Sequence, residues 1–139
     1  RQINSGAYST VIGVFLTQLK NRQPLTITGD GTIRRDFTYI DDVVEANILA
    51  ARNKKTLKGE IINIGMGKDY SINEVATMVL KVPSSSSEKA RKEKLLTYIP
   101  PRPAESRATL ADNSKAKKIL GWTPKISFAQ GLELTRAYY

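Results

Sequence analysis

A glycine turn between two strand-like segments is the feature that most constrains the fold of this chain. Leu25 to Thr28 has the composition of a short strand, Gly29-Asp30-Gly31 follows as a turn, and Asp36 to Ile40 alternates as a second strand would. Two aspartates then place negative charge at the start of a helix over 41–51, where it favours the helix dipole. The order of these elements predicts a mixed α/β domain.

The other predicted elements follow from helical spacing of apolar residues, from serine capping boxes and from short β-like runs. The predicted helices cover Tyr8 to Lys20, Ser71 to about Lys81, Asn113 or Ser114 to Leu120, and a last segment opened by Ser127. The predicted strands cover Glu60 to Ile64 and Thr97 to Ile99. Residues 83–96 begin with a proline and four serines and are expected to form a flexible link, although 88–96 could be a short charged helix. We therefore expect a small α/β domain over residues 1–139, with short strands and four to five helices.

The composition removes several classes of chemistry. The 139 residues include neither cysteine nor histidine, which excludes Cys/His zinc sites, disulfides and Ser-His-Asp triads, and we expect no metal site. The lack of cysteine fits a reducing compartment, and no membrane-length apolar run is present, so we expect a cytoplasmic protein. The chain starts with Arg1 rather than methionine, and we expect it to be part of a longer protein.

The formal charge of +9 suggests an alternative function. Clustered Lys and Arg residues release counterions from a phosphate backbone, so a basic module that binds nucleic acid has to be considered. A net +6 of the excess lies between Lys81 and Lys118. Charge runs are usually solvated faces, and we therefore consider nucleic-acid binding the less favoured function.

Two arginines in constrained segments are the main candidates for a ligand site. Arg35 follows the glycine turn, and Arg102 lies between two prolines that restrict its backbone. Two such guanidinium groups can hold a diphosphate through bidentate, charge-assisted hydrogen bonds. Arg34 could equally be the functional member of its pair, and Arg107 could assist.

Each of these arginines also has a plain structural explanation. Arg35 could form a surface salt bridge with Asp36 or Asp42, which would contribute little to stability. Arg102 could be a solvated loop residue. A further possibility is that the whole chain is a structural remnant that binds no ligand.

Two motifs of nucleotide-dependent oxidoreductases are missing from the sequence. No tyrosine is followed four residues later by lysine, so there is no Tyr/Lys catalytic pair. Gly65 and Gly67 lack a third glycine at Tyr70, so there is no G-x-G-x-x-G fingerprint for a dinucleotide. We therefore assign no catalytic residue and no cofactor-binding residue to this chain.

Four stretches in order resemble one family, the extended short-chain dehydrogenase/reductases of the NAD-dependent epimerase/dehydratase group. The chain resembles their C-terminal, substrate-binding part, without most of the Rossmann domain. The matching stretches are Arg1-Gln2, the block from Gly29 to Val43, Asn63-Ile64-Gly65 followed by Ser71-Ile72-Asn73-Glu74, and Arg102 through Pro124. Together they span nearly the whole chain.

The resemblance implies roles for particular residues. Arg35 and Arg102 would bind the diphosphate of a UDP-sugar, the strand residues Leu25, Thr26 and Ile27 would border the nucleoside, and Tyr8 would lie near the sugar. The longer enzyme would bind NAD in a Rossmann domain and use a Tyr/Lys pair to oxidise the sugar at C4. This machinery would lie upstream of Arg1, so the isolated chain is expected to be inactive and to bind no NAD. Its expected partners are the missing Rossmann half or another copy of the chain.

The resemblance is greatest to one subgroup of the family, and the sequence departs from the family pattern at two places. The sequence looks most like UDP-glucose and UDP-N-acetylglucosamine 4-epimerases, with dTDP-glucose dehydratases and UDP-glucuronate-processing enzymes as near alternatives. Ala104 replaces the glycine that usually follows Arg-Pro, which narrows the backbone angles of the loop that carries Arg102. The stretch from Lys81 to Leu96 is longer and more charged than in the family.

Overall fold

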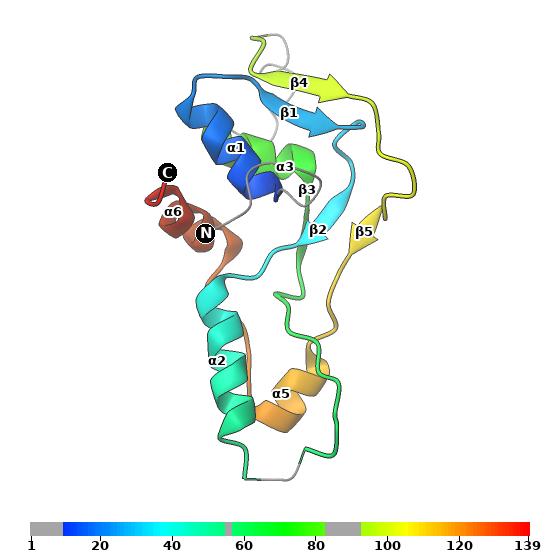
Figure 1. The fold of residues 1–139 in the computed structure, drawn as a ribbon, viewed down its shortest axis with the longest axis vertical. Coiled ribbons are helices and arrows are strands. Elements are labelled where there is room, and N and C mark those ends of the chain that lie inside the picture. The colour runs from blue at the N-terminus through cyan, green and yellow to red at the C-terminus, as the bar shows by residue number, and fades with distance from the viewer. Residues whose placement is uncertain (1–9, 55–56, 83–92) are drawn as a thin grey trace.

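The fold is a small α/β arrangement of short strands and helices (Figure 1). The computed structural model describes residues 10–54, 57–82 and 93–139. The helices among them are α1 (Val11–Lys20), α2 (Ile40–Ala51), α3 (Ile72–Leu80), α5 (Ser114–Leu120) and α6 (Phe128–Arg136). The strands are β1 (Leu25–Thr28), β2 (Arg34–Asp36), β3 (Asp69–Ser71), β4 (Leu96–Ile99) and β5 (Ala108–Thr109). The predicted fold class is confirmed.

The strands form two small sheets. β1 pairs in parallel with β4, and β2 lies between antiparallel β3 and parallel β5. Figure 1 shows the β1–β4 pair at one end of the molecule beside α1 and α3, while α2 and α5 form the other end. Within the described ranges, no helix is long and apolar enough to cross a bilayer.

The two predicted serine capping boxes form, whereas the Asn113 side chain makes no capping hydrogen bond at the start of α5. The Ser71 hydroxyl accepts a hydrogen bond from the Glu74 amide, and the Glu74 carboxylate accepts one from the Ser71 amide, which opens α3. Ser127 and Gln130 form the same capping box at α6. Gly121 ends α5 in the left-handed conformation, with φ +67°.

Two apolar clusters hold the elements together. The larger one packs α1 and α3 against β1 and β4, and its fully buried members include Phe15, Leu25, Ile27 and Val75. The smaller one joins α2 to α5 around Trp122, which is 1% exposed. The indole N–H of Trp122 donates to the Asp42 carbonyl at 2.8 Å, so this end of the molecule has its own polar anchor.

Two of the predicted strands differ from the structure. The second strand covers Arg34–Asp36 rather than 36–40, because Phe37 turns into the core and stacks on Phe128 at 4.9 Å. Residues 60–64 form no strand, and β3 lies farther along the chain at Asp69–Ser71. β5 was not predicted, since two residues give no readable alternation.

The remaining predictions on boundaries have mixed outcomes. Residues 83–92 of the predicted link or short helix lie outside the described residues, and β4 begins at Leu96, within the predicted link. The first helix begins at Val11 in the described part of the chain, and the predicted start at Tyr8 lies outside it.

Candidate functional site

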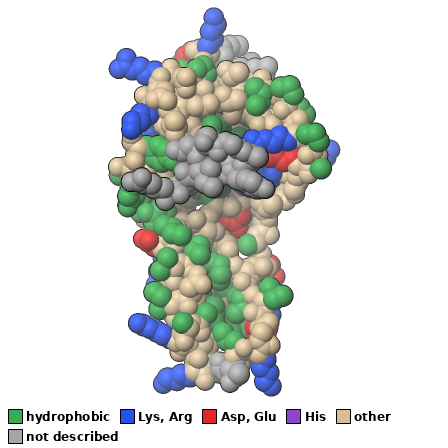
Figure 2. Space-filling view, in the orientation of Figure 1, with side chains coloured by type: hydrophobic (Ala, Val, Ile, Leu, Met, Phe, Trp, Pro, Cys, Tyr) green, Lys and Arg blue, Asp and Glu red, His purple; other side chains and the backbone are tan. Residues whose placement is uncertain are grey.

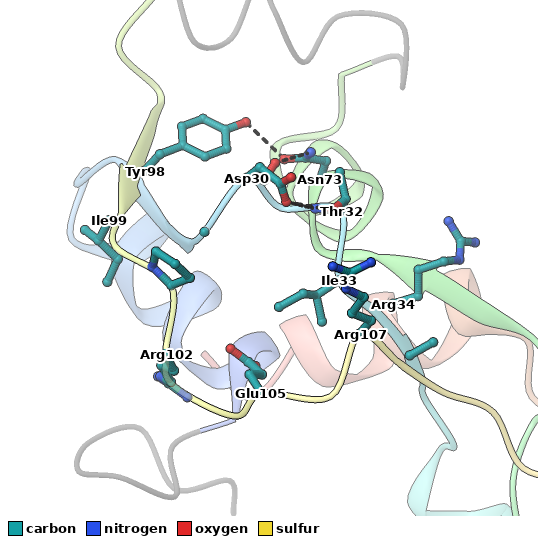
Figure 3. Close-up of a pocket in the computed structure, with 13 residues that line it drawn as sticks. Asp30, Thr32, Ile33, Arg34, Asn73, Tyr98, Ile99, Arg102, Glu105 and Arg107 are labelled. Atoms are coloured by element: carbon teal, nitrogen blue, oxygen red, sulfur yellow. Dashed lines mark hydrogen bonds between the residues drawn. The ribbon is translucent and has the colours of Figure 1, made fainter.

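A cavity of about 1130 Å³ lies between the glycine turn and the loop that connects β4 to β5. Figure 3 shows this loop curving around the cavity, from Ile99 through Arg102 and Glu105 to Arg107. The opposite wall is formed by the turn and by the start of α3. The polar and charged lining residues are Asp30, Thr32, Arg34, Asn73, Tyr98, Arg102, Glu105 and Arg107, so Arg34 rather than Arg35 lines the cavity directly.

The glycine turn is fixed against α3 by one asparagine. The side-chain amide of Asn73 donates to the Asp30 carbonyl at 2.9 Å, and its oxygen accepts from the Tyr98 hydroxyl at 3.0 Å. Hydrogen bonds from the Thr32 hydroxyl and amide, with a smaller contribution from Arg107, hold the pKa of Asp30 below its ordinary value. The wall of the cavity is therefore held by a connected polar network.

Arg34 and Arg35 point to opposite faces of β2, as neighbouring strand residues must. Arg34 pairs with Asp69 at 2.9 Å and with Glu74 at 3.2 Å. These carboxylates, Asp69 first, raise the pKa of Arg34. Two carboxylates compensate the charge of Arg34, so it is the poorer anion ligand of the two arginines.

Arg35 is tied to the loop that borders the cavity. Its Nη1 donates to the carbonyls of Arg34 at 2.9 Å and Ser106 at 2.8 Å, and its Nη2 pairs with Glu105 at 3.1 Å. The salt bridge expected with Asp36 or Asp42 does not form. Both aspartates instead accept backbone amides, Asp36 from the 66–67 turn and Asp42 from residues 125–126.

Arg102 lies on the exposed loop and lines the cavity together with Glu105. In the part of the chain that the structure describes, its guanidinium has no ion-pair partner. One carboxylate oxygen of Glu105, Oε2, is buried and has no hydrogen-bond partner among the described residues. Glu105 thus joins the two predicted arginines, since it pairs with Arg35 and shares the cavity with Arg102. Arg107 also lines the cavity, and among the described side chains it pairs with neither Asp112 nor Glu105.

The predicted β1 residues differ in what they can offer a ligand. Leu25 and Ile27 are fully buried, with 0% exposure, so their side chains face the core. The Thr26 side chain points to the opposite face of β1. The Thr26 amide donates to Gln18 Oε1 at 3.0 Å, and Gln18 Nε2 donates to the Thr26 hydroxyl at 2.9 Å. Tyr8, which was predicted near the sugar, lies outside the described residues.

Three residues that carry the geometry were not singled out from the sequence. Glu105, Asn73 and Gln18 act through contacts across more than one element, and no local spacing identifies such contacts. Glu105 had a weak signal, because it lies three residues after Arg102 in a restricted loop. Asn73 and Gln18 had none beyond their polar type.

The described residues do not fit a dinucleotide. The Gly65-Met66-Gly67 turn has two backbone amides that could face a phosphate, but both donate to Asp36, at 3.0 and 2.9 Å. The two small sheets also lack the doubly wound parallel arrangement that places a pyrophosphate at a helix N-terminus. A second cavity, of about 1320 Å³, lies between α1, α6 and residues 36–43, and it contains neither of the predicted arginines.

Comparison with known proteins agrees with these features. The chain is 40% identical over 122 residues to UDP-glucuronate 4-epimerase of Thermodesulfobacterium geofontis, covering 87% of this chain and 35% of that protein. It is 36% identical to a putative UDP-glucose 4-epimerase of Methanocaldococcus jannaschii, covering 88% and 36% respectively. The chain thus spans about a third of the length of these relatives.

Solved structures give the same result. UDP-glucose 4-epimerase of Thermotoga maritima, solved with UDP-glucose, superposes with a TM-score of 0.82 at 35% identity, covering 99% of this chain and 41% of that one. UDP-glucuronic acid 4-epimerase of Bacillus cereus, in complex with NAD, gives 0.75 at 35% identity, covering 93% and 38%. The family model described as GDP-mannose 4,6 dehydratase matches residues 2–135. The chain therefore belongs to the GDP-mannose 4,6 dehydratase family, as predicted from its resemblance to the NAD-dependent epimerase/dehydratase group.

Proposed function

We propose that this chain is the nucleotide-sugar-binding part of an NAD-dependent epimerase that acts on a UDP-sugar. The observation that carries the proposal is the placement of Arg35 and Arg102 around Glu105, which pairs with Arg35 and lines one cavity together with Arg102. The Thermotoga maritima relative, solved with UDP-glucose, supports the choice of ligand.

The diphosphate would lie between the two arginines. Arg35 uses three of the five N–H groups of a guanidinium for the protein, which leaves two for a phosphate. Arg102 is exposed and brings a full charge without a described carboxylate partner. Glu105 is the nearby anion, and its unpartnered oxygen, Oε2, can accept a hydrogen bond from a hydroxyl of the ligand.

The nucleoside would lie along β1. Because the side chains of Leu25 and Ile27 are buried, β1 would contact it through its backbone and through Thr26. Tyr8 would approach the sugar, as the family resemblance implies. The identity of the sugar and the direction of the reaction would be set by the rest of the enzyme.

NAD and the catalytic Tyr/Lys pair would belong to another part of the longer enzyme, because the described residues do not fit the cofactor. That part would also cover an apolar face of this chain. Ile40, Val44 and Ile48 lie four residues apart on α2 and are 60%, 48% and 44% exposed. A stripe of this kind favours a covering partner, either the missing half or another copy of the chain.

The alternatives are weaker on the same observations. A dTDP-sugar dehydratase or a UDP-glucuronate-processing enzyme would use the same pair of arginines, so the family relatives leave these open. A nucleic-acid module would need free cations on one face, but Arg34, Arg35, Lys81, Lys115 and Lys125 are ion-paired. In Figure 2 the visible Lys and Arg side chains are spread over both ends of the molecule. We propose a cytoplasmic protein, as expected from the lack of cysteine.

Calorimetric titration with UDP, UMP and uridine tests the proposal. UDP is expected to bind more tightly than UMP, and uridine more weakly than both, because only UDP bridges two guanidinium groups. Arg35→Ala and Arg102→Ala are each expected to weaken UDP binding about 10- to 100-fold. Arg52→Ala, on the exposed end of α2, is the matched control and is expected to change nothing. Equal affinity for UDP and uridine would contradict the proposal, and so would unchanged UDP binding by both variants.

A further inference from the structure

Arg35 holds the β4–β5 loop, whose residues Arg102, Glu105 and Arg107 line the cavity. In the described ranges, two hydrogen bonds reach Glu105 and Ser106 from outside the loop, and both come from the Arg35 guanidinium, at 3.1 and 2.8 Å. A third bond, to the Arg34 carbonyl, fixes the guanidinium against its own strand. Arg35 thus fastens the loop at Glu105 and Ser106, and the Arg34 amide holds its end by donating to the Arg107 carbonyl at 2.9 Å.

The fastened loop contains a backbone conformation that its residue disfavours. Ala104 has φ +56°, in the left-handed region where a Cβ crowds the backbone. A glycine would adopt the same angle without this cost. Such a conformation persists only where the surroundings impose it. The residues on either side supply the constraint, since Glu105 and Ser106 are held by Arg35 and Arg102 is restricted by its flanking prolines.

We propose that Arg35 is a positioning residue for Arg102 in addition to its proposed contact with the diphosphate. Its bonds to Glu105 and Ser106 keep Ala104 in the left-handed conformation, and this conformation aims Arg102 at the cavity. Two N–H groups serve the loop, one serves the Arg34 carbonyl, and two are left for the ligand. The ligand half of this inference rests on the proposed function, whereas the loop half does not.

Two consequences distinguish this arrangement from two independent arginines. Removal of Arg35 releases the loop even when no ligand is present, because Ala104 returns to its preferred angles. Removal of Arg102 from a chain that already lacks Arg35 then costs little UDP affinity, because Arg102 is no longer held in place. Independent arginines would give additive losses.

The loop half is tested on the ligand-free chain by backbone ¹⁵N relaxation. The order parameters of residues 104–106 are expected to fall from above about 0.8 in the native chain to below about 0.6 in Arg35→Ala. Arg35→Ala/Ala104→Gly is expected to recover part of this order, since glycine removes the conformational cost. Lys94→Gly is the matched control, because Lys94 also has a left-handed φ of +59° but lies before β4. In the Arg35→Ala background it is expected to recover nothing at residues 104–106.

Glu105→Ala provides a second, milder variant in case Arg35→Ala weakens the sheet. It removes one of the two ties without touching β2, and a smaller fall in the same order parameters is expected. Order parameters that stay at native values in both variants would overturn the inference. Equal recovery by Lys94→Gly would overturn it too, because the effect would then be one of overall stability.

The ligand half uses a double-mutant cycle for UDP affinity with Arg35→Ala, Arg102→Ala and the double variant. The double variant is expected to bind UDP within about twofold of Arg35→Ala alone. Additive losses would overturn the positioning role. Failure of the native chain to bind UDP would contradict the proposed function, while the relaxation experiment would still decide whether Arg35 locks the loop.

Discussion

The side chain of Asn73 occupies the space that a Cβ on Gly31 would need. A Cβ built on Gly31 would lie 2.2 Å from Asn73 Oδ1 and 2.6 Å from its Cγ. Gly31 also has φ +74°, which disfavours any other residue. This close approach lets Asn73 reach both the Asp30 carbonyl and Tyr98. The glycine is therefore required twice, once for its backbone angle and once for space.

Gly31→Ala is expected to destabilise the chain markedly. The backbone penalty adds to the loss of Asn73 hydrogen bonds, and together they lower the free energy of unfolding by about 2 to 4 kcal/mol. Urea denaturation followed by circular dichroism measures this. Gly59→Ala is the matched control, because Gly59 has φ +73° with nothing within 4 Å, and it is expected to lose only the backbone part. Equal losses in the two variants would contradict the role of the Asn73 contact.

The glycine turn also shows how much of the fold the sequence predicts. The two glycines, the capping serines and the helical spacing are local signals, and the elements that depend on them form largely where expected. Residues 60–64 alternate like a strand, but a strand needs a neighbour to complete its hydrogen bonds, and the described residues provide none. Strand assignment failed where it depended on the partner rather than on the segment itself.

Asp42→Asn is expected to loosen the end of the molecule built on α2. The Asp42 carboxylate is 3% exposed and accepts the amides of Lys125 and Ile126, one on each oxygen. An asparagine would turn an N–H group toward one of these amides, at a cost of about 1 to 3 kcal/mol. Asp41→Asn, at the neighbouring exposed position, is expected to change stability by less than about 0.5 kcal/mol. Thermal unfolding of both variants measures the difference, and an equal effect would refute the buried role.

The capping carboxylate of α3 is expected to contribute to acid sensitivity. The Ser71 backbone hydrogen bond, with Arg34 as a smaller cause, lowers the pKa of Glu74 from its ordinary 4.5. A lowered folded pKa means that the contribution is complete above pH 4.5 and is lost as the pH falls through the folded value. Glu74→Gln keeps the cap but cannot titrate. Its stability is expected to fall less steeply below pH 4.5 than that of the native chain, as measured by urea denaturation across pH 3 to 7. Identical slopes would argue against the assignment.

The apolar face of α2 is expected to govern self-association. Val44 is 48% exposed, so Val44→Ser is expected to lower the free energy of unfolding by only about 1 kcal/mol. The same change is expected to reduce association of the chain, because it interrupts the stripe formed with Ile40 and Ile48. Sedimentation velocity over a range of concentrations measures the association. A native chain that stays monomeric throughout would contradict a second copy as the covering partner.

The candidate site was predictable in its charges but not in its connections. Arg35 and Arg102 stand out because each lies in a restricted segment, and both lie near Glu105 in the structure. Their link through Glu105 joins positions 70 residues apart in the chain, which no local pattern encodes. The choice between Arg34 and Arg35 also needed the structure, because only the strand pairing shows that Arg34 faces Asp69 and Glu74.

The most direct test of the central claim is to map UDP binding on the chain by amide chemical shifts. Saturable shifts are predicted to concentrate at Arg35, at residues 102–107 and along β1, and to disappear in Arg35→Ala while Arg52→Ala behaves like the native chain. Shifts confined to the second cavity between α1 and α6, or the absence of any saturable shift, would contradict a diphosphate site between Arg35 and Arg102.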